Sequence, residues 1–403
     1  MEIRIGEVEY LADESLGRMS SQSSQDHWHP PINTRRYSNP VMGDSVGSQE
    51  GGSGTIGPLL QIAQKFYRLL NWHIFDDEGT SRYWDQSSPP ELLTFHPSLD
   101  DSSGYSSSIG KTVAFSGRMY KTTRISNSIR NAMPHARDNV TVTDWVLVET
   151  TTPPRVNRVR KIMGPERCDS FSEKITITAE PKSPASCPNG YSQMVYSTGR
   201  TSGYTVGQIC EIPTQFKQNG VKTRNWSIES TQLPDECWNL GGMGVPGDSG
   251  AAVIDCRTNE LLGQIWGRNR YQGNPTEPRL TFFTAMSDIY DDIRERMPGW
   301  QPALPTEKSI ASEAHRRSTL ASISEDGDAL PASQLESNSS QPSARCSSPL
   351  LLDETESTPS TGRSSPALRR SVARASVRLS GCGDLPGFNP VRRWAMIAHA
   401  ATF

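Results

Sequence analysis

Short apolar runs separated by polar turns follow one another between about residues 56 and 300, a spacing typical of β-strands. The clearest pair is 55–62 and 66–72, which three turn-compatible residues separate. This pair predicts a β-hairpin. Similar apolar patterns predict further strands at 3–10, 109–117, 139–149, 175–179, 261–267 and 281–286.

Two other segments complete the predicted elements. Residues 195–209 predict two short strands around a Gly-rich turn. Residues 287–297 begin with Ser287, a residue type that caps helices, and place Ile289 and Ile293 four positions apart. This pattern predicts an amphipathic helix at the end of the folded part.

The composition changes at both ends of the chain and predicts three regions. Residues 1–50 form an N-terminal extension that is mostly irregular from residue 11 to residue 49. Residues 51–300 hold most of the apolar and aromatic side chains and form the folded domain. In residues 301–403, Ser, Pro, Glu and Arg dominate without a sustained apolar pattern, which predicts a disordered tail.

The overall charge narrows the classes of partner. A net charge of −3 favours neither a nucleic-acid-binding protein nor a strongly acidic one. The sequence holds no apolar run long enough to span a membrane, and its start lacks the basic and apolar parts of a secretion signal. We therefore expect no nucleic-acid or membrane partner, and an intracellular protein of the cytoplasm or nucleus.

Cysteine and histidine usage bears on metals and disulfides. The seven cysteines are scattered without a CxxC pair, which argues against a disulfide framework and against a zinc site. His27 and His29 flank Trp28, but no third ligand lies near them in the sequence, so we expect an exposed loop. His96, which precedes Pro97, is also expected to be exposed. The sequence predicts no metal and no cofactor.

The richest local pattern is the stretch 241–255. Gly247 and Gly250 bracket Asp248 and Ser249, and an apolar strand follows at once. The glycines allow a tight turn that presents a serine hydroxyl and directs backbone N–H groups toward one point. Acyl transfer requires this combination of a nucleophile and donors for the developing oxyanion. The alternative interpretation is a Gly-rich turn that enters a strand.

The segment Gly-Asp-Ser-Gly at 247–250 resembles the nucleophile loop of chymotrypsin-like (trypsin-like) serine proteases. The segment 71–75, Asn-Trp-His-Ile-Phe, follows a strand pair as the histidine segment does in that family. Asp144, at the head of an apolar strand, resembles the third triad member. The segment 199–207 and the Trp266-Gly267 pair are similar to the start of the second barrel and to a strand of the substrate cleft.

This resemblance implies an all-β fold of two six-stranded antiparallel β-barrels with a C-terminal helix, flanked by disordered N- and C-terminal extensions. It also implies a serine endopeptidase acting on polypeptides. His73, Asp144 and Ser249 would form the triad, and the N–H groups of Gly247 and Ser249 the oxyanion hole. The resemblance places Met243, Trp266 and Gly267 in the substrate cleft. Met243 stands where trypsin has an acidic residue, so selectivity for basic side chains is not supported.

Other interpretations of the same residues remain open. His73 alone fits a buried strand end and Asp144 a strand cap, while His135 is a weaker candidate base in a turn. The chain order His, Asp, Ser excludes an α/β-hydrolase, which needs its histidine after the serine in a Gly-x-Ser-x-Gly context. An inactive protease-like scaffold and a protein that binds protein partners through its tail are the alternative functions.

Overall fold

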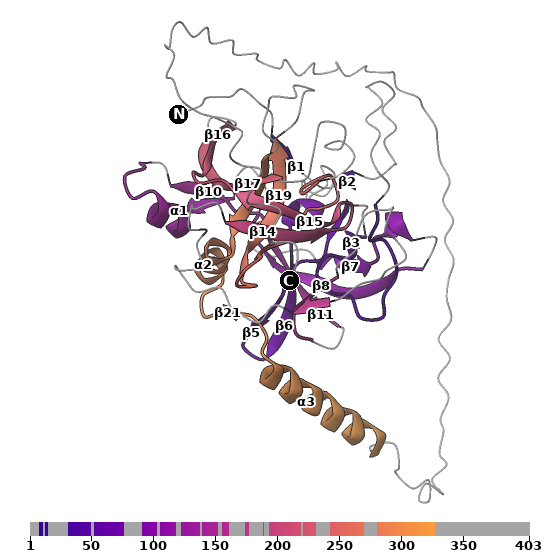
Figure 1. Cartoon of the computed structure of the whole chain (residues 1–403). Coiled ribbons are helices and arrows are strands. Elements are labelled where there is room, and N and C mark those ends of the chain that lie inside the picture. Colours follow the sequence, from indigo (N-terminus) through magenta and orange to yellow (C-terminus); the bar gives the residue numbers. More distant parts are fainter. Residues whose placement is uncertain are drawn as a thin grey trace, which may run out of the picture. The chain divides into compact units, whose positions relative to one another are not determined.

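The computed structural model describes most of the apolar middle of the chain and parts of its flanks. Its architecture is shown in Figure 1. The described residues are 8–10, 13–14, 31–49, 52–75, 91–102, 105–117, 122–137, 139–151, 155–160, 174–176, 188, 193–218, 221–230, 242–269 and 280–326.

Strands between residues 45 and 150 form a closed antiparallel barrel. Its strands are β3 (Ser45–Ser48), β4 (Gly52–Thr55), β5 (Leu59–Ile62), β6 (Lys65–Leu70), β7 (Leu93–His96), β8 (Ser107–Phe115) and β11 (Val146–Thr150). Neighbours pair in the order β4-β3-β7-β8-β11-β6-β5. Because only residues 56–58 separate β4 from β5, the two act as one bent strand, which closes a six-stranded ring.

Strands between residues 194 and 285 form another closed antiparallel ring. Its strands are β14 (Met194–Gly199), β15 (Gly203–Ile209), β17 (Val221–Ser230), β18 (Ala252–Asp255), β19 (Leu261–Asn269) and β20 (Leu280–Ala285). Each strand pairs antiparallel with two others, in the cyclic order β14-β15-β17-β20-β19-β18. The predicted pair of six-stranded antiparallel barrels is therefore confirmed.

Shorter strands and helices accompany these two barrels. Strand β1 (Val8–Tyr10) pairs with β19, β2 (Asp13–Glu14) with β4, β16 (Thr214–Gln218) with β17, and β21 (Pro302–Ala303) with β5. Two further pairs are β9 (Thr123–Ile125) with β10 (Val140–Val142) and β12 (Arg158–Arg160) with β13 (Lys174–Thr176). The helices are α1 (Asn127–Ala132), α2 (Met286–Arg296), α3 (Glu307–Asp326) and the 3₁₀ turns η1 (Trp72–Ile74) and η3 (Leu99–Asp101).

Alternation along the strands divides the apolar side chains among three main clusters. Leu70, Val146 and Val148 pack with the interior cluster of the first barrel, and Val253 packs with that of the second. Their neighbours point the other way because successive strand residues face opposite sides. Those neighbours and helix α2 form a third cluster that joins the barrels, with Leu69, Leu147, Ala252, Ile254, Ile289 and Ile293 among its members. The predicted closing helix is thus part of the central packing.

The flanks of the domain differ from the sequence prediction. Residues 45–48, predicted to be irregular, form β3, so the first barrel begins before residue 51. The strand is short and has one large apolar residue, Val46, so it gives no periodic signal, and pairing with β4 and β7 supplies its hydrogen bonds. This pairing is a tertiary contact that local patterns do not report.

The beginning of the predicted disordered tail is also ordered in part. Residues 302–303 form β21, and residues 307–326 form α3. Thr306 and Ser309 exchange backbone and side-chain hydrogen bonds at the start of α3, at 3.0 and 3.2 Å. The helix shows little apolar periodicity, so the pattern that identified α2 was absent here, and local capping explains its start. The remaining tail lies outside the described residues.

Two further findings concern the helices and the cysteines. Within the part of the chain that the structure describes, no helix combines the length and apolar character needed to cross a bilayer. Of the cysteines in that part, Cys210 and Cys256 are free thiols.

Candidate active site

The predicted general base, His73, lies in the turn η1 directly after strand β6. The residues around it, Trp72, Ile74 and Phe75, pack into the interior cluster of the first barrel. This packing fixes the turn, and the histidine itself is only 8% exposed. The backbone N–H of His73 donates to Asp144 Oδ1 at 3.1 Å, and its Nδ1 contacts Asp144 Oδ2. The sequence-predicted base and acid are therefore brought together.

Asp144 lies in the loop between β10 and β11, where neighbouring residues anchor the backbone. The Thr143 N–H donates to the carbonyl of Thr122 at 2.8 Å, and the Trp145 N–H donates to Ser116 Oγ at 3.0 Å. Asn71 Nδ2 donates to the Asp144 carbonyl at 2.7 Å and approaches Oδ2 at 3.4 Å. Sequence reasoning missed Asn71, although it stands two positions before the histidine.

Ser249 comes from the second barrel and completes the group. Its Oγ lies 2.6 Å from His73 Nε2, and the residue is fully buried. The imidazole therefore contacts a carboxylate through one nitrogen and a hydroxyl through the other. This geometry allows a proton to leave the hydroxyl while the carboxylate stabilises the imidazolium that forms.

Contacts with both barrels shape the loop that carries Ser249. On the first barrel, the Thr55 N–H donates to the Ser249 carbonyl at 2.7 Å, and Thr55 Oγ1 donates to the Gly247 carbonyl at 2.8 Å. On the second barrel, the Gly250 N–H donates to the Ile265 carbonyl at 3.0 Å. Thr55 is a second residue that sequence reasoning missed, because its partner lies almost two hundred positions away.

The two glycines of the loop are required by its conformation. Gly247 and Gly250 have φ angles of +92° and +96°, which L-residues with side chains rarely adopt. A Cβ at Gly250 would lie 2.2 Å from the Thr55 carbonyl oxygen. The N–H groups of Gly247 and Ser249 donate to no acceptor among the described residues, as expected for donors that serve a reacting oxygen.

The fully buried Asp248 side chain holds the backbone on either side of the loop that carries Ser249. Its Oδ1 accepts the N–H groups of Thr201 and Ser202 at 3.1 and 3.0 Å. Its Oδ2 accepts those of Gly244 and Val245 at 3.2 and 3.1 Å. Burial raises the pKa of this carboxyl, and the hydrogen bonds oppose that change. The sequence left the partner of Asp248 open, and the structure supplies four backbone donors.

The residues predicted for the substrate cleft are largely enclosed. Met243 and Trp266 are 0% and 1% exposed, and Met243 packs in the interior cluster of the second barrel. Neither side chain offers a contact surface in this structure, so their role in substrate binding stays a prediction. Gly267 lies in β19, where its backbone pairs with β20 and β1.

Four other histidines, His27, His29, His96 and His135, fall into three groups. His135 is exposed, in a turn after α1. His27 and His29 lie outside the described residues. The prediction for His96 was wrong, because the side chain is 1% exposed. Its Nδ1 donates to the Ser45 carbonyl at 2.7 Å and its Nε2 accepts the Tyr37 N–H at 3.0 Å, contacts made by a segment predicted to be irregular.

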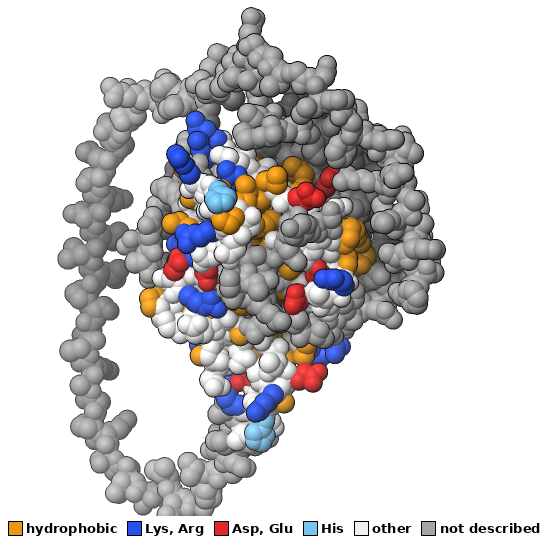
Figure 2. All heavy atoms as spheres, turned by 60° about the vertical axis from the view of Figure 1, so that its left-hand side comes forward, with side chains coloured by type: hydrophobic (Ala, Val, Ile, Leu, Met, Phe, Trp, Pro, Cys, Tyr) orange, Lys and Arg blue, Asp and Glu red, His pale blue; other side chains and the backbone are white. Residues whose placement is uncertain are grey.

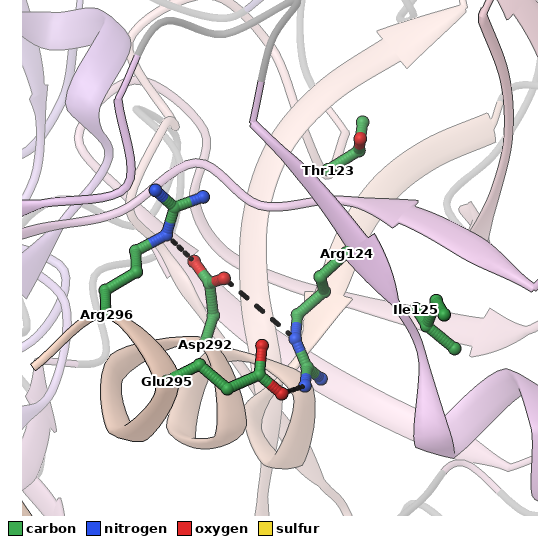
Figure 3. A pocket seen from close by; sticks show the side chains of 6 residues that line it. All are labelled: Thr123, Arg124, Ile125, Asp292, Glu295 and Arg296. Atoms are coloured by element: carbon green, nitrogen blue, oxygen red, sulfur yellow. Dashed lines mark hydrogen bonds and ion pairs between the residues drawn. The ribbon is translucent and has the colours of Figure 1, made fainter. Parts of the chain in front are cut away.

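A second group of charged residues lies between β9 and helix α2, around Arg124. It lines a pocket of about 330 Å³, and Figure 3 shows Arg124 and Arg296 reaching the acidic side chains of α2. The guanidinium of Arg124 is 2.6 Å from Glu295 and 3.4 Å from Asp288. On the face drawn in Figure 2, basic, acidic and apolar side chains of the described residues are interspersed. Sequence analysis gave no signal for this cluster.

Together, these observations define the architecture. Two closed six-stranded antiparallel barrels hold a histidine and an aspartate on the first and a serine on the second, and a helix follows. The chain therefore has the chymotrypsin-like fold of serine proteases, as its sequence predicted.

Comparison with known proteins finds similarity in structure and not in sequence. No family model and no curated protein matches the chain. Thermobifida fusca Protease A is 14% identical, with a TM-score of 0.36 over 66% of this chain and 98% of its own. A serine protease specific for glutamic acid is 12% identical, with a TM-score of 0.38 over 66% of this chain and 100% of its own. Cellulomonas bogoriensis chymotrypsin is 15% identical, with a TM-score of 0.34 over 66% of this chain and 98% of its own. At these identities the similarity concerns the fold alone, which rests on the strand pairing above.

Proposed function

We propose that the protein is a serine endopeptidase that hydrolyses polypeptides through an acyl-enzyme. The observation that carries the proposal is the continuous contact of Asp144 with His73 Nδ1 and of His73 Nε2 with Ser249 Oγ, at 2.6 Å. A histidine that only fills a strand end has no need of contacts with both a carboxylate and a hydroxyl. The ordered contact therefore favours nucleophilic chemistry over a structural role.

Each group has a defined task in the proposed reaction. Ser249 Oγ attacks the peptide carbonyl carbon while His73 Nε2 takes the hydroxyl proton. The same nitrogen then protonates the leaving amine, and a water molecule hydrolyses the acyl-enzyme by the reverse proton path. Asp144 holds the Nδ1–H tautomer and stabilises the imidazolium. Asn71 orients Asp144 and is a positioning residue.

The oxyanion formed in each step needs donors that are already in place. The N–H groups of Gly247 and Ser249 are the candidates, and each well-placed donor contributes roughly 3 kcal/mol. Asp248 and Thr55 hold the peptide planes of this loop through the hydrogen bonds described above. The chain uses its own backbone donors at Asp248, so the loop does not depend on an outside group for this contact.

The proposal is tested by labelling with a fluorophosphonate, which reacts with activated serines. We expect label on Ser249, located by mass spectrometry, and none in the Ser249→Ala or His73→Ala proteins. Ser197→Ala, a change at a buried serine of the same barrel outside the site, serves as the matched control and keeps the label. A folded protein that takes no label would contradict the proposal and support the inactive-scaffold alternative.

A further inference from the structure

The two strands nearest the start of the chain lie on different barrels. Strand β1 pairs antiparallel with β19, with Tyr10 opposite Gly267. Strand β2 pairs antiparallel with β4, with Asp13 opposite Ser53. Only two residues separate Tyr10 from Asp13 in the sequence, so a short stretch of chain links an edge of the second barrel with an edge of the first.

On β19, the segment lies directly beyond the nucleophile loop. Strand β20 occupies one edge of β19, and β18 pairs with the other edge as far as Gln264. Along that other edge the Gly250 N–H then bonds to Ile265, and the pairing with β1 begins at Gly267. The nucleophile loop and β1 are therefore consecutive on the same edge.

The arrangement on β4 is equivalent. Strand β3 pairs with one edge of β4, and β2 pairs with the other at Gly52 and Ser53. Two positions further on, the Thr55 N–H bonds to the Ser249 carbonyl at 2.7 Å. Because three residues of extended chain span at most about 11 Å, the two paired edges lie close together on either side of the nucleophile loop.

The reactive groups are enclosed. Ser249 is 0% exposed, Asp144 2% and His73 8%. A polypeptide substrate must bring a carbonyl carbon to Ser249 Oγ, so it has to approach along the strand edges that flank the nucleophile loop.

Extended polypeptides commonly bind proteins by adding a strand to an exposed sheet edge, where main-chain hydrogen bonds give affinity without selecting a sequence. The edges of β19 and β4 beside Ser249 are such surfaces, and β1 and β2 fill both of them. We propose that strands β1 and β2 occupy the polypeptide-binding edges of the site from within the same chain and compete with substrate. This inference rests on the proposed peptidase function.

The size of the two pairings indicates a reversible block. Three residues of β1 and two of β2 pair with the barrels, and such short edge strands open locally at low free-energy cost. A segment tethered in this way acts at an effective concentration on the order of millimolar. A polypeptide that binds the edges more tightly would displace it.

The test uses the full chain carrying the paired substitution Glu9→Pro and Tyr10→Pro. Backbone N–H groups of successive strand residues point to opposite sides, so two adjacent prolines remove a ladder donor whichever residue faces β19. Ser20→Pro with Ser21→Pro, outside the paired strands, is the matched control. The first readout is hydrogen exchange of the amides at 52–53 and 267–269 in proteins that also carry Ser249→Ala. The second is the rate at which fluorophosphonate labels Ser249 in proteins that keep this serine.

We expect the Glu9→Pro, Tyr10→Pro protein to exchange faster at both edges and to label about tenfold faster than the parent, because a larger fraction of molecules is open. A new N-terminus between residues 11 and 13 in the parent, absent from its Ser249→Ala form, would also support the proposal. Equal exchange, or faster exchange with equal labelling, would overturn it. Absence of label from every protein would refute the proposed peptidase function, and exchange alone would then decide whether the strand occupies these edges.

Discussion

Asp144 and Asp288 are both buried carboxylates at the ends of strands or helices, yet their surroundings differ in kind. Asp288 accepts the hydroxyls of Ser126 and Ser128, both at 2.6 Å, and lies 3.4 Å from the Arg124 guanidinium. Asp144 instead contacts His73 and Asn71, and none of the described residues brings an arginine or lysine to it.

The difference separates a structural carboxylate from one suited to chemistry. At Asp288 a permanently charged partner and hydroxyl donors compensate the charge, and these contacts fasten α1 and β9 to helix α2. Burial raises the pKa of Asp288, and these contacts oppose the change. At Asp144 the compensating partner is an imidazole, which can gain and lose a proton. The identity of the partner, rather than burial, thus distinguishes the two sites.

Substitution of each aspartate by asparagine tests this distinction most strongly. Asp144→Asn should lower the labelling rate of Ser249 about 10⁴-fold, because the amide favours the wrong imidazole tautomer. Asp288→Asn should leave that rate nearly unchanged in the fraction of protein that is folded. Labelling rates corrected for folded protein by circular dichroism provide the measurement. Similar losses in both variants would contradict the division of roles.

Substitution of Arg124 should change the stability of the protein rather than the rate at which Ser249 is labelled. Arg124→Met leaves the buried Asp288 without its cation, whereas Asp291 and Asp292 keep Arg294 and Arg296. Loss of this buried pair should lower the free energy of unfolding by about 3 kcal/mol. The matched control is Arg294→Met, which removes a half-exposed arginine of helix α2 that pairs with Asp291. This change should lower the free energy of unfolding by less than about 1 kcal/mol. Urea unfolding curves measure both changes. Equal stabilities of the two variants would show that the network does not fasten α2.

The smallest expected effect concerns His96 and pH. Burial lowers the pKa of His96 below its ordinary value of 6.5, so the unfolded chain takes up a proton there before the folded chain does. Its contribution should therefore lower the free energy of unfolding as the pH falls below about 6.5. His96→Asn should flatten that part of the pH profile, whereas His135→Asn, at an exposed position, should not. An unchanged slope in His96→Asn would refute this assignment.

The barrels, and the three residues His73, Asp144 and Ser249 that the structure brings into contact, could be predicted because their signals are local. The hairpin at 55–72, the strand that follows Ser249 and the spacing of Ile289 and Ile293 each report their own element. The glycines at 247 and 250 likewise mark a turn that other residues rarely form.

The remaining features depend on contacts between distant parts of the chain. Thr55 supports the nucleophile loop from the other barrel, and Asp248 binds backbone N–H groups, which no residue type marks in a sequence. His96 appeared to lie in a polar loop because the segment that buries it, around Tyr37 and Ser45, has no periodic pattern. Tertiary contacts therefore decided what local composition left open.

The contact between Trp145 and helix α2 has a consequence for synthesis of the protein. Trp145 directly follows Asp144, and its indole N–H donates to Asp292 at 2.7 Å. The loop that holds Asp144 is thus braced by a helix that the ribosome makes only after both barrels. A nascent chain, or one ended by a stop codon before residue 292, lacks this brace, so this loop gains its last support only after the barrel strands have been synthesised.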